Sequence, residues 1–403
     1  MARIVFLSVP AYGHLNPVLP IVRELVRRGH QVSVFNEVPL KPAIEAAGAR
    51  FVAYPEAMSM EDMAAVLMNG DLITTFNLFL SVTPKLYDFC WRSLSAERPD
   101  ILVVDGIALW GEMTGRKLRV PTVVTSPFFA YEIGRNMAPG EMSRALGHLV
   151  GGFGQLVVNW IRVALAGGVH RMPLHWPLLP VRGNLTMMLT SRALHPPSPI
   201  FDRRGWDFAG AMIDPSTRLD SFDFGRLDGR PVIYVSLGTL IFGKTDFYER
   251  CMAALADYPA QVLLSAGRGS DLARFAHAPP NFIVAETFPQ LEILKHTDIF
   301  ITPAGLNSLH EALWFGVPMV AVPQHFEQLH NAAAMERGGA GIALDAESHG
   351  GTVRSEDLRH AVEQIAADLK GFKARAAALG LSLHEAGGFL GAAGRIEEMI
   401  RPA

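Results

Sequence analysis

Cysteine is scarce in this sequence: only two of its 403 residues, Cys90 and Cys251, carry a thiol. They lack the spacing of a metal site or of a disulfide framework, which favours a reducing compartment. The apolar run from Ile4 to Val9 is too short for the core of a signal peptide and leads into Pro10 and Gly13, so it predicts a buried strand and no export signal. We therefore expect a cytoplasmic protein.

Charge of one sign is also lacking. The chain has 36 Lys and Arg against 39 Asp and Glu, a net charge of −3, with no long run of either sign. That balance argues against a nucleic-acid partner. One apolar stretch, Leu146 to Val169, has the length of a membrane span, but Gln155, Asn159 and Arg162 interrupt it, so we reject a transmembrane segment. We expect a helix packed inside its own domain, with a wall for an apolar ligand as the second choice.

What the sequence does have is a repeated alternation of apolar strands and helices. With 49% hydrophobic and 19% charged residues it has the composition of a folded protein, and its length suggests two or three domains. The first half begins with a strand at 3–9, a helix at 17–28 and a strand at 31–35. Because such strands are apolar on both faces and alternate with helices, we expect a parallel sheet covered by helices on both sides.

The composition changes between His195 and Arg230, where prolines and polar residues gather, and this change predicts a domain boundary. The alternation then restarts, so the second half is expected to be another doubly wound α/β unit. We place the domains at 1–214 and 215–384, with a C-terminal helix at 385–403 that packs back on the first domain. Ligands of such units bind at the carboxyl edges of the sheets, so we expect the chemistry between the domains.

The loop after the first strand, Gly13-His14-Leu15-Asn16-Pro17, carries a candidate catalytic group. Asn16 suits a helix N-cap and Pro17 the first helical position, which places His14 just ahead of a helix N-terminus, where the neutral imidazole is favoured. Asp105 ends a later strand at the same sheet edge, and a carboxylate there can orient one ring nitrogen. A dyad of His14 with Asp105 and a helix cap made by Asp105 alone are equally compatible with the spacing.

Two strand-to-loop junctions in the second half predict an anion site. Thr302-Pro303-Ala304-Gly305-Leu306-Asn307-Ser308 joins a strand to a helix, and Ser236-Leu237-Gly238-Thr239 follows another strand. Small residues and backbone N–H groups at a helix N-terminus suit phosphate, so the two loops together are expected to form a diphosphate cradle. Neither loop is a P-loop or a dinucleotide-binding fingerprint, and no Asp-x-Asp pair is present. We therefore expect the charge to be neutralised without a metal.

An ordered series of motifs fills the second half: Phe288-Pro289-Gln290-Leu291-Glu292-Ile293-Leu294, Phe300 to Ser308, Glu311-Ala312-Leu313, Gly316-Val317-Pro318-Met319, and Pro323-Gln324-His325-Phe326-Glu327-Gln328 with Asn331-Ala332. With the loop at 13–17, the series resembles the inverting, UDP-sugar-dependent glycosyltransferases of family 1, nearest to the bacterial type that glycosylates macrolides and flavonoids. The resemblance spans nearly the whole chain. It implies the GT-B fold, in which two Rossmann-like domains with doubly wound parallel sheets face each other across a cleft.

The resemblance also implies a role for each site residue. His14 would be the general base and Asp105 its orienting partner. Asn307 and Ser308, in the loop that contains Gly305, would contact the diphosphate. Gln290 would lie close to the nucleoside, Glu311 would bind the ribose hydroxyls, and Glu327 and Gln328 would bind the hydroxyls of the sugar. Carboxylates and amides suit these last roles, because they accept hydrogen bonds from several hydroxyls at once.

The chain departs from the family pattern at two positions. The family usually has a histidine where this chain has Pro303, so one donor to the phosphate is missing, which is worth about 1.5–3 kcal/mol of donor binding or leaving-group stabilisation. Thr287 occupies the position where many relatives carry the aromatic ring that stacks on uracil. Either Phe288, one residue further on, takes that role, or the preference for the nucleotide is relaxed.

The resemblance implies an enzyme that moves a hexose, with UDP-glucose as the expected donor, to a hydroxyl of an apolar natural product. It would need no cofactor beyond this nucleotide-sugar co-substrate. A non-catalytic helper of the same fold, motivated by Pro303, and a UDP-sugar epimerase are the alternatives. The intact His14, Glu311, Glu327 and Gln328 argue against the helper, and an epimerase would not need the pair at 327–328.

Overall fold

The computed structural model describes residues 1–57, 59, 72–130, 141–167, 179–215, 222–238 and 245–400, with the side chains at 72–73, 141–152 and 349 left out of the description. The chain divides into two compact units. Unit 1 contains Met1–Arg192, Pro196–Ile213 and Ala386–Ala403, and unit 2 contains Ala193–His195 and Asp214–Glu385. The sequence predicts the division between 214 and 215, one residue from its place in the structure.

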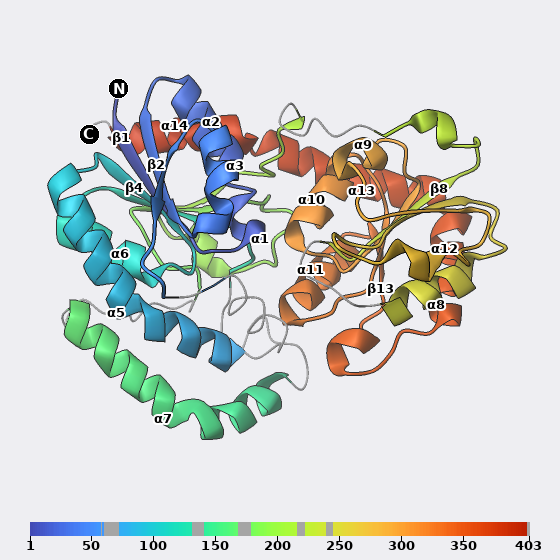
Figure 1. The fold of residues 1–403 in the computed structure, drawn as a ribbon, viewed down its shortest axis with the longest axis horizontal. Helices are drawn as coiled ribbons and strands as arrows, with labels where there is room; N and C mark the ends of the chain where they lie inside the picture. Colours follow the sequence, from blue (N-terminus) through green and yellow to red (C-terminus); the bar gives the residue numbers. More distant parts are fainter. Residues whose placement is uncertain are drawn as a thin grey trace. The chain divides into compact units, whose positions relative to one another are not determined.

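Unit 1 is built on a parallel sheet. In its described part the sheet has seven strands in the order β3-β2-β1-β4-β5-β6-β7, all paired in parallel (Figure 1). The strands are β1 (Arg3–Leu7), β2 (Gln31–Asn36), β3 (Arg50–Ala53), β4 (Ile101–Asp105), β5 (Thr122–Ser126), β6 (Leu185–Met188) and β7 (Trp206–Phe208). From β1 the chain adds β2 and β3 on one side and then β4 to β7 on the other, so the strand order reverses between β1 and β4. Ligands of doubly wound sheets bind at such a reversal.

Helices cover both faces of this sheet. Successive residues of a strand point to opposite faces, and both sets of side chains are apolar here, so each face packs against helices. Ile4 and Phe6 of β1 belong to one buried cluster with residues of α2 (Leu19–Arg27), α3 (Lys41–Ala46) and α14 (Gly388–Ile400). Val5 and Leu7 belong to another, with residues of α5 (Leu72–Glu97), α6 (Leu109–Leu118) and α7 (Glu141–Gly167). The strands are therefore apolar on both faces, as the sequence indicates.

The C-terminal helix α14 packs on α2 within unit 1 (Figure 1). An ion-pair network joins the two helices: Glu24 accepts from Arg27 and Arg28, and Glu397 accepts from Arg28 and His30. The hydrogen bonds from Arg27 and Arg28 lower the pKa of Glu24 to about 2, so this carboxylate stays charged at neutral pH.

The long helix α7 packs against α5 on one side, where the Asn159 amide donates to the backbone oxygen of Asn77. Its other side exposes apolar side chains, among them Phe153, Ile161 and Leu165. The predicted helix in this stretch is present, and its face toward α5 is packed. In the part of the chain that the structure describes, no helix combines the length and apolar character needed to cross a membrane.

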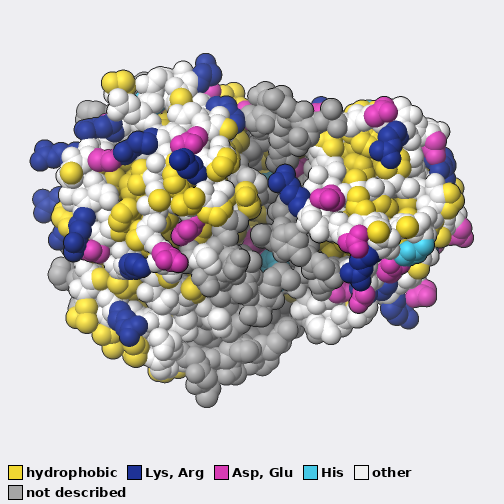
Figure 2. Space-filling view, in the orientation of Figure 1, with side chains coloured by type: hydrophobic (Ala, Val, Ile, Leu, Met, Phe, Trp, Pro, Cys, Tyr) yellow, Lys and Arg dark blue, Asp and Glu magenta, His cyan; other side chains and the backbone are white. Residues whose placement is uncertain are grey.

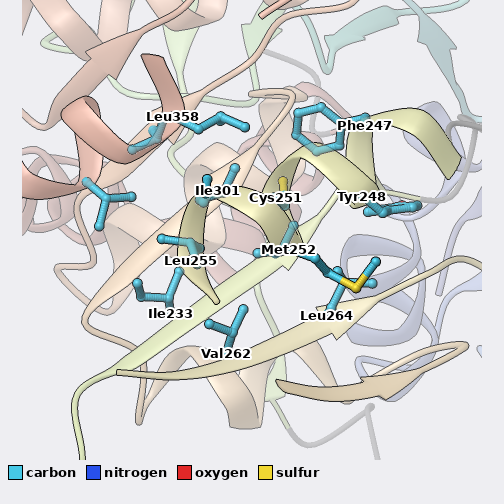
Figure 3. Packing of buried hydrophobic residues seen from close by; sticks show 14 of the residues in the cluster. Ile233, Phe247, Tyr248, Cys251, Met252, Leu255, Val262, Leu264, Ile301 and Leu358 are labelled. Atoms are coloured by element: carbon cyan, nitrogen blue, oxygen red, sulfur yellow. The ribbon is translucent and has the colours of Figure 1, made fainter. Parts of the chain in front are cut away.

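Unit 2 has a second parallel sheet, whose described part has six strands in the order β10-β9-β8-β11-β12-β13. A buried cluster on one face joins strand residues such as Ile233 and Leu264 to Leu255 of α8 and Leu358 of α12, with the thiol of Cys251 inside it (Figure 3). The elements are β8 (Val232–Ser236), α8 (Thr245–Leu255), β9 (Gln261–Ser265), β10 (Phe282–Ala285), α9 (Gln290–Leu294), β11 (Ile299–Thr302), α10 (Leu306–Trp314), β12 (Met319–Ala321), α11 (Phe326–Arg337), β13 (Gly341–Ala343), α12 (Ser355–Ala367) and α13 (Leu369–Glu385).

Candidate active site

In unit 1 the structure brings His14 and Asp105 together. β1 and β4 are neighbouring parallel strands, so the residues that follow or end them meet at the carboxyl edge of the sheet. His14 Nδ1 lies 2.8 Å from Asp105 Oδ2, and the side chains of the two residues are 14% and 1% exposed. A hydrogen bond this short between a ring nitrogen and a buried carboxylate holds the imidazole in a fixed orientation.

The second oxygen of Asp105 is used as well. Oδ1 accepts a hydrogen bond from the backbone N–H of Ile107 at 3.0 Å. With one oxygen on the backbone and the other facing His14, the carboxylate acts as an acceptor on both sides. This pattern assigns the proton of the neutral imidazole to Nδ1 and its lone pair to Nε2, the arrangement that a general base requires.

An aromatic ring and a glycine shape the surroundings of the dyad. The ring of Phe128 lies 5.8 Å from that of His14, centroid to centroid. A Cβ atom on Gly106 would come within 2.9 Å of both Phe128 and Pro180, so this position has room only for glycine. His14 therefore lies against an apolar wall, which is suited to an apolar acceptor.

The predicted helix start beside His14 is wrong. His14 lies inside the short helix α1 (Tyr12–Leu15), and Asn16 follows it as the C-cap. Pro17 has no N–H and cannot extend the hydrogen-bond ladder, so α1 ends there. The next helix, α2, begins at Leu19 after Val18, which has no capping side chain. The buried Leu15 explains why the turn forms early, since it packs into the core of unit 1.

In unit 2 the two predicted anion-binding loops follow neighbouring strands. β8 ends at Ser236 and pairs with β11, which ends at Thr302. The Ser236 hydroxyl accepts from the backbone N–H of Gly238 at 3.2 Å, which tightens this turn. Thr239 lies outside the described residues. The two loops thus meet at one sheet edge.

The N-terminus of α10 supplies the second loop. Gly305 is its N-cap, without a capping side chain, and Asn307 and Ser308 lie in its first turn. Unpaired backbone N–H groups and the positive end of the helix dipole gather at such a terminus. A phosphate group is the ligand that this arrangement favours.

A hydrogen-bond network ties Gln290 to two more of the predicted donor residues. Its Nε2 donates to Ser308 Oγ at 3.2 Å and to Glu311 Oε2 at 2.6 Å. Its Oε1 accepts from the hydroxyl of Tyr234 at 3.4 Å, a phenol whose pKa burial raises to about 12. Glu311 is 4% exposed, so the network fixes a buried carboxylate beside the first turn of α10.

The helix α11 carries the predicted sugar-binding pair. Glu327 lies in its first turn, after the N-cap His325. Gln328 is buried, and its Oε1 accepts from the backbone N–H of Gln324 at 2.8 Å. The side chain of Gln328 therefore holds the loop ahead of α11 in place through its oxygen. Its NH₂ group is the part of the side chain that could donate a hydrogen bond to a ligand. This loop contact is a role that the sequence did not reveal.

Sequence reasoning also missed Asn331 as a contact of the phosphate loop. The fully buried Asn331 donates through Nδ2 to the carbonyl oxygen of Ala304 at 3.0 Å. Ala304 has φ 62°, a left-handed conformation that is unfavourable for a residue with a Cβ atom. The only signal in the sequence is a small residue between Pro303 and Gly305, since a tight loop selects small side chains.

Two histidines of unit 2, His310 and His325, could take the place of the donor that is missing at Pro303 only if they were charged. Burial lowers the pKa of His310 to about 3 and also lowers the pKa of His325. Both imidazoles are therefore neutral at physiological pH. The missing donor is not supplied as an imidazolium by either of them.

Phe288 belongs to an aromatic cluster of unit 2. Its ring meets those of Phe222 and Tyr234 edge to face, at centroid distances of 5.5 and 6.2 Å. Thr287 beside it is exposed. Part of the Phe288 surface remains accessible, which suits one flank of a base-binding site. Among the described residues, no group of three or more His, Cys, Asp or Glu side chains lies close enough to hold a metal ion.

Known glycosyltransferases are similar to this chain in sequence and in fold. Residues 224–385 match the family model described as UDP-glucuronosyl and UDP-glucosyl transferase. The chain is 27% identical to an NDP-glycosyltransferase of Bacillus subtilis, over 99% of this chain and 97% of that protein. It is 28% identical to the oleandomycin glycosyltransferase of Streptomyces antibioticus, over 85% of this chain and 78% of that protein.

A solved structure covers both units. The glycotransferase of kitacinnamycin superposes with a TM-score of 0.83 at 28% identity, and the match covers 99% of this chain and 98% of that one. The two parallel sheets and their strand order are those of the GT-B fold. The chain is similar to family 1 UDP-glycosyltransferases over nearly its whole length, and its residues 224–385 match the model of that family.

Proposed function

We propose that the protein transfers a hexose, glucose in the first place, from a UDP-sugar to a hydroxyl group of an apolar small molecule, with inversion at the anomeric carbon. The acceptor class we propose is a polyketide, macrolide or flavonoid. The observation that carries this proposal is the hydrogen bond of 2.8 Å between His14 Nδ1 and the buried Asp105. It gives unit 1 an oriented base beside the apolar ring of Phe128.

The proposed step starts with the acceptor hydroxyl close to His14. Nε2 takes its proton while the oxygen attacks the anomeric carbon from the face opposite the diphosphate. The bond from the anomeric carbon to the diphosphate oxygen breaks, and the nucleoside diphosphate leaves with the electron pair. An α-linked donor therefore gives a β-glycoside. Asp105 stabilises the imidazolium that forms, because its oxygen already faces Nδ1.

Unit 2 would bind the donor in this proposal. The first turn of α10, with Asn307 and Ser308, and the turn at Ser236 and Gly238 would hold the diphosphate. Glu311, held by Gln290, would accept from the ribose hydroxyls. Glu327 and the NH₂ group of Gln328 would contact the sugar. The proposal requires the acceptor hydroxyl, while hydrogen-bonded to His14 Nε2, to reach the anomeric carbon of this donor.

Pro303 motivates one alternative, a non-catalytic helper of the same fold that binds a nucleotide sugar. Loss of one donor to the phosphate weakens leaving-group stabilisation but leaves the His14–Asp105 dyad intact. A maintained base is useful only to an enzyme, so the geometry favours transfer. An epimerase would act on the donor alone and would release no glycoside.

The test is incubation of the pure protein with UDP-glucose and a panel of phenols and macrolides, read by mass spectrometry. Glycoside together with UDP is the expected result, and its loss in His14→Ala with unchanged donor binding identifies the base. UDP without glycoside would indicate hydrolysis or epimerisation, and no turnover in either protein would indicate the helper. Thymidine diphosphate glucose in a parallel arm shows whether the uridine preference holds.

A further inference from the structure

A large cavity lies at the amino edge of the unit 1 sheet, the edge opposite to that of His14 and Asp105. Its volume is about 710 Å³, and its lining includes the starts of β5 and β6 and the end of α6. His14 and Asp105 lie at or beyond the carboxyl ends of β1 and β4. Since all strands are parallel, the two places belong to opposite edges. The cavity is therefore separate from the reacting groups.

Three guanidinium groups and one carboxylate give this cavity its charge. Arg116, Arg119 and Arg182 line it together with Glu112. Arg116 forms an ion pair with Glu112, which is 2% exposed. Among the described residues, no carboxylate pairs with Arg119 or Arg182. The lining thus carries two positive charges without a counter-charge.

The guanidinium group of Arg182 is held in place although it lacks an anionic partner. It lies over the ring of Trp206, 4.6 Å from the ring centroid, and Nη2 donates to the backbone oxygen of Arg204 at 3.4 Å. Its Nε is buried and meets no hydrogen-bond acceptor within the described ranges. Burial and the nearby charge of Arg203 lower its pKa. A buried donor without an acceptor is costly, and an acceptor supplied by a ligand would remove that cost.

We propose that this cavity binds a small organic molecule that carries a phosphate or diphosphate group, at a site distinct from the donor site of unit 2. The fixed Arg182 and the exposed Arg119 would donate to the phosphate oxygens, which guanidinium groups contact in pairs. The side-chain oxygen of Asn184 accepts from the backbone N–H of Thr122 at 2.9 Å, so its NH₂ group faces other contacts. It would add a third donor.

The charge balance supports a dianion over a neutral ligand. The three arginines carry +3, and Glu112, whose pKa burial raises to about 7, removes at most one charge, so the net charge is at least +2. The C-terminal end of α6 opposes an anion with about half a negative charge, which leaves the site clearly positive. The volume of about 710 Å³ is that of a site for a small molecule with an organic body, larger than a bare phosphate needs. Figure 2 shows Lys and Arg side chains, with some Asp and Glu between them, along the outer edge of unit 1 on the left of the view.

Calorimetric titration of the full-length protein with inorganic pyrophosphate tests the proposal. The titration is done on the wild type and on Ser308→Glu, a variant that places a negative charge in the first turn of α10 and so excludes an anion from the donor site of unit 2. We expect binding to persist, and to weaken about tenfold or more in Arg182→Gln and in Arg119→Gln, because each variant loses a charged hydrogen-bond donor. Arg119 is exposed, so its variant keeps the fold even if Arg182→Gln does not.

Arg92→Gln is the matched control, since it removes a guanidinium from the surface of the same unit, paired with Asp88 and away from the cavity. Its affinity should equal that of the wild type. Equal affinity in the Arg182 and Arg119 variants, or no binding to the Ser308→Glu protein, would overturn the assignment. Glucose 6-phosphate and AMP serve as competitors: displacement by one of them identifies the organic body, whereas displacement only by sulfate would indicate an adventitious ion.

Discussion

The Asp105→Asn variant keeps the imidazole of His14 in place but changes which of its ring nitrogens carries the proton, so it tests the role of Asp105 by itself. Asp105 accepts on both sides, from Ile107 N–H through Oδ1 and from His14 Nδ1 through Oδ2. Asparagine has one acceptor oxygen and one NH₂ group. If the oxygen keeps the bond to Ile107, the NH₂ group faces Nδ1, which must then accept. The proton of the ring moves to Nε2, and the imidazole can no longer take a proton from the acceptor.

The expected magnitude follows from what the base contributes. General-base catalysis is worth about 10²–10⁴-fold in rate, so kcat should fall by that factor while the KM for the donor changes by less than about twofold. The variant also loses a charge-assisted hydrogen bond at a side chain that is 1% exposed. That loss lowers the free energy of unfolding by about 1.5–3 kcal/mol.

Steady-state assays of glycoside formation, with thermal unfolding of the same samples, measure both effects. Asp207→Asn is the matched control, because it removes a carboxylate paired with Arg395 in the same unit, away from the dyad. It should lose stability without losing kcat. Full activity of Asp105→Asn, or a loss confined to the KM for the donor, would refute the reasoning, since neither follows from a changed tautomer of His14.

Three further predictions concern other parts of the chain. Pro303→His restores a donor at the phosphate loop, so turnover should rise, or the KM for the donor fall, by about tenfold; an unchanged rate would mean that another group already fills the role. Arg98 has φ 48° at the end of α5, so Arg98→Gly should raise the free energy of unfolding by about 0.5–1 kcal/mol, whereas Arg92→Gly inside the helix should lower it by about 1 kcal/mol. Denaturant titration measures both changes, and a change in the same direction for the two variants would contradict backbone strain at Arg98. Burial raises the pKa of Glu112 from 4.5 to about 7, so the unfolded chain releases this proton first and wild-type stability falls as pH rises through that window, by about 3 kcal/mol. Glu112→Gln lacks this titration, so its stability relative to wild type should increase by up to that amount between about pH 5 and about pH 8; parallel pH curves would show that Glu112 is ionised in the folded protein throughout.

Much of the fold could be predicted because its strands and helices follow from local patterns of apolar and polar residues. Apolar strands such as Ile101 to Val104 and Ile299 to Thr302 are bounded by loops and alternate with amphipathic helices, and the structure has strands at both places. The two doubly wound sheets follow from that alternation. The sequence pattern also predicts a helix at about 60–68, and these residues lie outside the described ranges.

The predictions of the site differ in what they depend on. The sequence puts His14 and Asp105 at the same sheet edge and leaves a dyad and a helix cap by Asp105 equally open. The structure brings the two side chains together because β1 and β4 are adjacent strands. The conformation around His14 could not be predicted, because the turn that forms α1 depends on burial of Leu15 in a core assembled from distant helices. The contact of Asn331 with Ala304 could not be predicted either. It joins residues 27 positions apart through the backbone oxygen of Ala304, and every residue type has such an oxygen, so the sequence does not indicate the contact.

The conformation of the phosphate loop shows what the replacement at Pro303 changes. The left-handed Ala304 and its hydrogen bond from Asn331 set the path of the chain into α10, and neither needs a side-chain donor at 303. Pro303 is buried and its fixed φ suits the turn before Gly305. If the protein binds a nucleotide sugar as proposed, the loop keeps the backbone N–H groups at the start of α10 for the phosphate and has one side-chain donor fewer. A defect in leaving-group departure with nearly normal nucleotide binding is what this combination predicts, and a comparison of UDP affinity with kcat in the wild type and in Pro303→His distinguishes the two contributions.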